Sequence, residues 1–209
     1  MKPCRWLSAL AMLIGALLLA SWSAILTATD HAGHADHAAL SAAAHSARSI
    51  YQLESGWTTA AEQPLRLGQL QGKVQVLAMV YTTCESACPI IVSLMQHIEA
   101  ALPLDLRSQV GFVLVTFDPA RDTPAVLSAY GARMGLDPMS WLLLFGHPDD
   151  VLELATLLGI KYKSDQGGGF IHSNVITVLN KAGEIAHRHE GLQQDMASTL
   201  EAIRRAVQD

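Results

Sequence analysis

The chain has 209 residues, of which 50% are hydrophobic, and a formal net charge of −5 with histidine neutral. This length allows one domain together with additional segments. No stripe of basic residues runs along the sequence, which argues against nucleic acid as a partner.

The first 29 residues have the pattern of a membrane anchor or a signal peptide. Lys2 and Arg5 precede an uncharged apolar run over residues 6–29, and this run is just long enough to cross a bilayer. The cleavage signal is weak because bulky Trp22 interrupts the small residues, so we favour an uncleaved anchor over a cleaved signal peptide. Positive charge before the span predicts that the rest of the chain lies on the outer, periplasmic side.

Residues 30–49 are expected to form a flexible linker. The stretch is rich in alanine and histidine and has almost no large apolar side chains with which to build a core. Its histidines could hold copper or zinc weakly, but we favour a solvated linker without a specific metal site. These histidines are His31, His34, His37 and His45.

From residue 50 to residue 209 the sequence alternates between strand and helix patterns. Apolar runs typical of buried strands cover residues 73–81, 110–117 and 141–145, and a hairpin is expected from residues 174–180 and 184–190. Apolar residues recur at helical spacing over residues 91–102, 123–134, 148–159 and 192–207. This order predicts an α/β fold with a central, mostly parallel sheet, an antiparallel C-terminal hairpin and flanking helices.

Two cysteines, Cys84 and Cys88, lie where the first strand gives way to the first helix. A thiol at a helix N-terminus is stabilised as the thiolate, which is both a nucleophile and a metal ligand. A disulfide that closes so short a loop would constrain the unfolded chain little, so a purely structural bridge is disfavoured. Helical residues four apart hold their Cβ atoms about 5–6 Å apart, wider than a disulfide allows. The pair can close only if Cys84 lies at or before the helix cap.

A selective metal site would need a third ligand, and His172 is the best candidate among the histidines of the domain. Soft thiolates select cuprous copper or zinc, and imidazole is a suitable partner for both. His172 follows a glycine-rich segment that we expect to be a mobile loop, and it precedes the strand at residues 174–180. The residue pattern leaves metal binding and thiol–disulfide exchange open as alternatives.

The other four histidines of the domain are less suitable as ligands. His97 lies nine residues after Cys88, on the opposite helix face, and we expect it to be exposed. His147 is expected in the cap region of a helix. His187 and His189 share one face of the last strand, which we expect to be solvated at the sheet edge.

Three motifs resemble those of the SCO/SenC family. They are Tyr-Thr-Thr-Cys-Glu-Ser-Ala-Cys-Pro at residues 81–89, Asp-Pro-Ala-Arg-Asp-Thr-Pro at residues 118–124 and His-Ser-Asn-Val-Ile-Thr-Val-Leu-Asn at residues 172–180. Their order and spacing agree with the family over roughly residues 50 to 207. Members are membrane-tethered copper proteins with a thioredoxin-like fold that are concerned with assembling cytochrome c oxidase. The resemblance therefore implies a thioredoxin-like fold for this domain.

The resemblance also implies roles for individual residues. Cys84 and Cys88 are similar to the copper-binding thiolates of the family, and His172 is similar to its imidazole ligand. Asp118 matches an aspartate beside the site, which implies a supporting role or occasional ligation; the alternative is a turn residue. Asp122 and Thr123 are expected to be helix-capping residues without a role in the chemistry, with Thr123 as the cap of the helix that follows.

Two functions remain in competition. The first is a metallochaperone that holds one copper ion and passes it to the copper-site subunit of cytochrome c oxidase or to another copper or thiol protein. The second is a thiol–disulfide oxidoreductase in which Cys84 attacks a partner's disulfide and Cys88 resolves the intermediate. Thiol exchange does not require His172, so this histidine discriminates between them. A thioredoxin would have two residues between its cysteines rather than three.

Overall fold

The computed structural model describes residues 46–193 and 195–209. The predicted anchor, residues 1–29, and the four linker histidines at positions 31, 34, 37 and 45 lie outside the described residues. Within the described part, none of the helices has the length and apolar character needed to cross a membrane.

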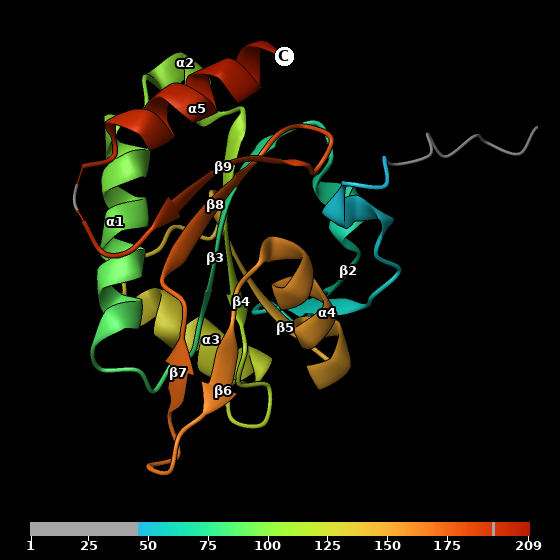
Figure 1. The fold of residues 1–209 in the computed structure, drawn as a ribbon, viewed down its shortest axis with the longest axis vertical. Coiled ribbons are helices and arrows are strands. Elements are labelled where there is room, and N and C mark those ends of the chain that lie inside the picture. The colour runs from blue at the N-terminus through green and yellow to red at the C-terminus, as the bar shows by residue number, and fades with distance from the viewer. Residues whose placement is uncertain (1–45, 194) are drawn as a thin grey trace, which may run out of the picture. The chain divides into compact units, whose positions relative to one another are not determined.

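Seven strands of the described residues form one sheet, in the order β2-β1-β5-β4-β3-β8-β9 (Figure 1). They are β1 (Trp57–Thr59), β2 (Pro64–Leu65), β3 (Val74–Val80), β4 (Val110–Thr116), β5 (Trp141–Gly146), β8 (Val175–Leu179) and β9 (Ile185–Glu190). The parallel strands β3, β4 and β5 occupy the middle. The flanking strands are antiparallel to their neighbours, and β8 and β9 form the predicted C-terminal hairpin. All seven residues of β3 are buried, which explains its continuous apolar sequence.

Helices cover both sides of this sheet, with α1 and α5 on one side and α4 on the other (Figure 1). Within the described residues the helices are α1 (Ala87–Ala101), α2 (Leu104–Arg107), α3 (Pro124–Arg133), α4 (Pro148–Leu158) and α5 (Ala197–Gln208), with 3-10 helices at Ile50–Gln52 and Leu67–Leu70. The predicted start of α3 is confirmed, because the Thr123 hydroxyl accepts a hydrogen bond from the Val126 N–H. The predicted end of α4 is also confirmed, at Gly159 with a φ of 69°.

The residues just before the predicted domain boundary are attached to the C-terminal hairpin. Ser49 is buried and forms a β-bridge with Glu184, between β8 and β9. The Ser46 hydroxyl also donates a hydrogen bond to the Glu184 carboxylate. Residues 46–49, which the sequence assigns to the linker, therefore pack against the folded domain.

The glycine-rich segment before His172 forms a loop, as predicted, at residues 165–169, but two short strands that were not predicted flank it and make it the turn of a β-hairpin. β6 (Tyr162–Ser164) pairs with β7 (Phe170–His172) in a separate two-stranded sheet (Figure 1). The Asp165 carboxylate accepts hydrogen bonds from the N–H groups of Gly167 and Gly169, at 2.8 and 2.7 Å, and thereby closes the turn. Strands of three residues are too short for the apolar alternation that signals a strand in sequence.

Candidate metal centre

The loop after β3 presents the two cysteines at the start of α1. Helix α1 begins at Ala87 with Ser86 as its N-cap, so Cys84 lies before the cap, as the sequence analysis requires for a closable pair. The Cys84 Sγ accepts a hydrogen bond from the Cys88 N–H at 3.4 Å and lies 3.8 Å from the Ser86 Oγ. Both thiols are buried, and neither forms a disulfide in the described structure.

Strand β7 brings His172 over the thiols from a distant part of the sequence. The His172 Nε2 lies 3.9 Å from the Cys88 Sγ. Its Nδ1 lies 3.1 Å from the carbonyl oxygen of Ser173. Because a carbonyl only accepts hydrogen bonds, Nδ1 carries the proton in the neutral ring, which leaves the Nε2 lone pair free on the side of the sulfur atoms.

These three side chains fit a soft metal ion. The sulfur atoms of Cys84 and Cys88 and a ring nitrogen of His172 all lie within 4.8 Å of one another. Ligand distances of about 2.3 Å for sulfur and about 2.0 Å for nitrogen place two ligands of a trigonal ion about 3.7 Å apart. The observed separation of 3.9 Å between Cys88 and His172 is close to this value, and two thiolates with one imidazole suit cuprous copper or zinc.

The two thiols have opposite acid–base properties. Burial raises the pKa of Cys84, but hydrogen bonds from the N–H groups of Cys88 and Ser86 and from both side chains more than offset burial and lower this pKa to about 6. Burial raises the pKa of Cys88 well above its usual range, and the negative charge of Cys84 adds to this effect. Cys84 is therefore the thiolate of the reduced, metal-free pair near neutral pH.

This asymmetry predicts which thiol reacts with an alkylating reagent. In the reduced, metal-free protein we expect the iodoacetamide rate at Cys84 to rise with pH, reach half of its maximum near pH 6 and level off above pH 7, because only the thiolate reacts. Cys88 should remain unmodified at pH 7. Mass spectrometry of quenched samples measures both, with Cys84→Ser as the control. Half-maximal labelling near pH 8.5, the value for an ordinary thiol, would contradict this prediction.

Aromatic rings enclose the imidazole. The His172 ring centroid lies 5.0 Å from that of Phe117 and 6.0 Å from that of Tyr81. Phe170, on the same hairpin, contacts both of these rings at 5.2 Å. These contacts join residues that are far apart in sequence, so no local pattern identifies them as part of the site.

Asp118 follows β4 and is linked to the hairpin of β6 and β7 through Arg121. Its carboxylate is buried and pairs with the Arg121 guanidinium. Arg121 also donates a hydrogen bond to the carbonyl of Gly168, in the turn between β6 and β7, and lies 5.8 Å from the centroid of the Phe170 ring. Asp118 is not part of the group formed by the two cysteines and the histidine, so this geometry favours support of the hairpin over direct ligation.

Because Arg121 links Asp118 to the hairpin that carries His172, we expect mutation of Arg121 to lower the affinity for the metal moderately. Arg121→Gln removes the charge that pairs with Asp118, and we expect copper affinity to fall by about 10-fold, because supporting residues of this kind are worth about 10–100-fold. Competition with a copper(I) chelator measures the change. Arg204→Gln, on the exposed surface of α5, removes the same charge and should have no effect. Equal affinity for Arg121→Gln and the unmodified protein would show that the link does not position His172.

Asp122 connects the cysteine loop to the end of β4, so its interpretation as a capping residue is wrong. Its side chain is fully buried. The carboxylate accepts hydrogen bonds from the Thr82 N–H at 3.0 Å, from the Thr82 hydroxyl and from the Thr116 hydroxyl at 2.6 Å. The cap of α3 is Thr123 instead.

The remaining histidines lie away from the centre. His97 is exposed on α1, as predicted, and His147 is the N-cap of α4, where its Nδ1 accepts a hydrogen bond from the Asp149 N–H. The prediction of a solvated face for His187 and His189 is wrong, because the segment leading into α5 and α5 itself cover this face. His189 is buried, and its Nε2 lies 3.1 Å from the Gln193 carbonyl oxygen. The His187 Nε2 lies 3.2 Å from the Thr199 hydroxyl.

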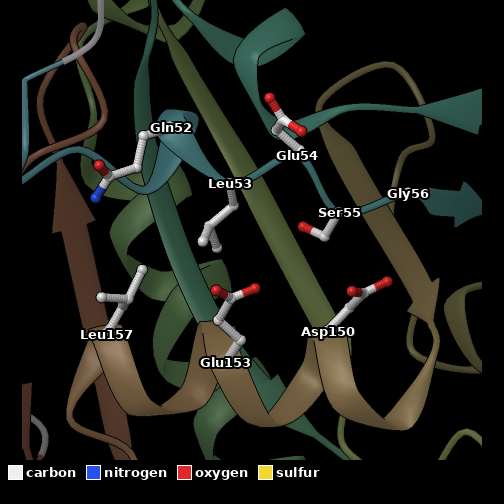
Figure 2. Close-up of a pocket in the computed structure, with 8 residues that line it drawn as sticks. All are labelled: Gln52, Leu53, Glu54, Ser55, Gly56, Asp150, Glu153 and Leu157. Atoms are coloured by element: carbon white, nitrogen blue, oxygen red, sulfur yellow. The ribbon is translucent and has the colours of Figure 1, made fainter.

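A cavity of about 660 Å³ lies away from the two cysteines and His172, between α4 and the segment before β1. Figure 2 shows the carboxylates of Glu54, Asp150 and Glu153 around it. Among the described residues, only the group of Cys84, Cys88 and His172 brings three metal-binding side chains within reach of one ion. The acidic cavity is therefore not a second metal centre on this geometry.

Comparison with known proteins agrees with the fold and the motifs. A family model described as SCO1/SenC matches residues 47–208. A Stutzerimonas stutzeri protein, whose name suggests that it binds copper, is 32% identical over 101 residues, which is 48% of this chain and 48% of that protein.

Solved structures show the same thioredoxin-like fold. A SCO1/SenC family lipoprotein from Bacillus anthracis str. Ames has a TM-score of 0.67 at 22% identity, covering 74% of this chain and 94% of that one. Bradyrhizobium japonicum ScoI, solved with copper bound, has a TM-score of 0.60 at 22% identity, covering 70% and 95%. The match of the family model to most of the chain shows that this protein belongs to the SCO1/SenC family.

Proposed function

We propose that this protein is a metallochaperone that holds one copper ion through Cys84, Cys88 and His172. The observation that carries the proposal is the convergence of two sulfur atoms and an imidazole nitrogen within 4.8 Å. Two soft sulfur donors with one nitrogen favour copper over the hard cations. The copper-bound structure of Bradyrhizobium japonicum ScoI and the name of the Stutzerimonas stutzeri relative support the same metal.

We further propose that the copper passes to the copper-site subunit of cytochrome c oxidase or to another copper or thiol protein. The three sequence motifs at residues 81–89, 118–124 and 172–180 support this role. The proposed position is on the outer side of a membrane, with residues 1–29 as the anchor. The apolar run at residues 6–29 and the lipoprotein relative in Bacillus anthracis support membrane attachment.

A copper titration tests the proposed metal site. The reduced protein is titrated anaerobically with copper(I) in the presence of a competing chelator, and we expect one copper ion per chain. Zinc, added in a parallel titration, should bind more weakly, because zinc takes four ligands whereas two thiolates and one imidazole suit the soft cuprous ion. Absence of binding, or saturation only at two or more ions per chain, would contradict the proposal.

A second candidate function is thiol–disulfide exchange, which the low pKa of Cys84 favours. The assay follows reduction of a protein disulfide by the reduced, copper-free protein, with Cys84→Ser as the inactive control. Activity that is unchanged in His172→Ala would favour the oxidoreductase, since exchange needs only the two sulfur atoms. An inactive protein that nevertheless binds copper would favour the metallochaperone.

A further inference from the structure

A cavity of about 380 Å³ opens next to Cys84. The loop that carries this cysteine forms one wall, through Thr82, Cys84 and Glu85, and helix α3 forms another, through Tyr130 and Arg133. His172 does not line it. The cavity therefore gives access to one of the three proposed ligands from a part of the surface that the imidazole does not occupy.

Tyr130 lines this cavity and carries a buried hydroxyl without a partner. Its side chain is 2% exposed, and its Oη has no hydrogen-bond partner among the described residues. Burial raises the pKa of Tyr130 well above its usual range, so the hydroxyl remains a donor. A buried polar group without a partner loses free energy that a ligand can restore by hydrogen bonding.

Arg133 brings a positive charge that no carboxylate neutralises in the described structure. Its guanidinium lies 5.1 Å from the centroid of the Tyr130 ring and donates only a long hydrogen bond, 3.4 Å, to the Thr82 carbonyl. A guanidinium offers a planar fork of donors that matches a carboxylate. Glu85 lines the same cavity and carries the opposite charge. Because Glu85 repels a carboxylate and Arg133 attracts it, an anionic ligand binds with its carboxylate towards Arg133.

We propose that this cavity binds low-molecular-weight sulfur compounds that carry a carboxylate, with the carboxylate at Arg133 and Tyr130 and the sulfur beside Cys84. The volume is within the range of about 300–1,000 Å³ that is usual for small-molecule sites. The inference deepens the proposed function, because it names a class of ligand that meets the sulfur of Cys84. The inference rests on the proposed function in one respect only, which is that Cys84 is a reactive sulfur of the site.

With a disulfide as the ligand, the reaction is a simple exchange. The Cys84 thiolate attacks one sulfur, the sulfur–sulfur bond of the ligand breaks, and a mixed disulfide forms at Cys84. The other half of the ligand leaves as a thiolate. The ligand itself is reduced, so no further oxidant takes part.

The test compares an anionic and a neutral reagent on the reduced, metal-free chain carrying Cys88→Ser, which stops the reaction at the mixed disulfide. The anionic reagent is 5,5′-dithiobis(2-nitrobenzoate) and the neutral one is 4,4′-dithiodipyridine. We expect Arg133→Gln to slow the anionic reagent by about three- to tenfold and to change the neutral one by less than about twofold. Both reagents react with the same thiolate at one pH, so a change in its ionisation cancels in the ratio.

Matched variants separate binding from general effects on the fold. Arg133→Lys should retain most of the preference for the anionic reagent, Glu85→Gln should increase it, and Arg204→Gln should leave it unchanged. Tyr130→Phe should slow only the anionic reagent. Raising the salt concentration to 1 M should bring the unmodified protein close to Arg133→Gln, because the charge is partly exposed.

Oxidised glutathione provides a natural ligand of the proposed class. Its exchange rate should fall in Arg133→Gln by a factor similar to that of the anionic reagent. If Arg133→Gln leaves the ratio of the two reagents unchanged, or slows both equally, the cavity does not recognise a carboxylate and the inference is wrong. The copper titration is independent of this ratio, so failure of either proposal can be told from failure of the other.

Discussion

Replacing either cysteine with serine is expected to lower copper(I) affinity by about 1,000-fold or more. Cys84→Ser and Cys88→Ser each exchange a soft thiolate for a hard hydroxyl, which leaves cuprous copper with one sulfur. His172→Ala should lower the affinity by about 100-fold, because both thiolates remain. Competition with a copper(I) chelator measures each constant, and the sulfur-to-copper absorption bands give a second readout.

The matched control for the histidine is His97→Ala. His97 lies on the exposed face of α1, the helix that carries Cys88, and it is not part of the group that could hold the metal. We expect its removal to leave copper affinity unchanged. If His172→Ala binds copper as tightly as the unmodified protein, the imidazole is not a ligand and the three-ligand proposal fails.

Replacement of Asp122 is expected to have the largest effect on stability. Asp122→Ala removes the acceptor of three hydrogen bonds and leaves the N–H and hydroxyl of Thr82 and the hydroxyl of Thr116 without this partner. Because each buried donor left without a partner costs about 1–3 kcal/mol, we expect the free energy of unfolding to fall by about 3 kcal/mol or more. Urea unfolding followed by circular dichroism measures the change.

Two neighbouring variants set the scale for this experiment. Asp122→Asn keeps one acceptor oxygen and should cost less than Asp122→Ala. Thr123→Ala removes only the helix cap of α3, which is worth about 1 kcal/mol. Because the network holds Thr82, two residues before Cys84, copper affinity should fall in the Asp122 variants but not in Thr123→Ala. An Asp122→Ala variant as stable as Thr123→Ala would show that the network is not a main support of the loop.

The central part of the fold could be predicted because its signals are local. Strand β3 is buried on both faces, so its sequence is apolar throughout, and α3 and α4 begin or end at residues with the chemistry of a cap. The position of Cys84 before the cap of α1 meets the condition that the spacing sets for a closable pair, but the sequence did not predict it. Strands β6 and β7 were missed because three residues each give too little pattern to recognise.

The centre was predictable only in part, since two of its proposed ligands are neighbours in sequence and the third is not. Cys84 and Cys88 can be identified from their spacing and position, whereas His172 was selected by its place before a strand and by resemblance. The contacts of Arg121 with the turn at Gly168, and of Asp122 with Thr82, join segments about 40 residues or more apart. Such pairings depend on how the elements pack, and no local pattern reports them.

The two-stranded sheet of β6 and β7 has a consequence for how tightly an ion is held. Its hydrogen-bond ladder is not continuous with that of the seven-stranded sheet. The nitrogen of His172 therefore belongs to the small sheet, whereas the sulfur atoms of Cys84 and Cys88 follow strand β3 of the large one. Withdrawal of the nitrogen would break side-chain contacts, such as those of Arg121 and the surrounding rings, and would leave the main-chain ladder of the large sheet intact. Substitutions in the hairpin can thus change how tightly a bound ion is held while the sulfur pair stays as it is.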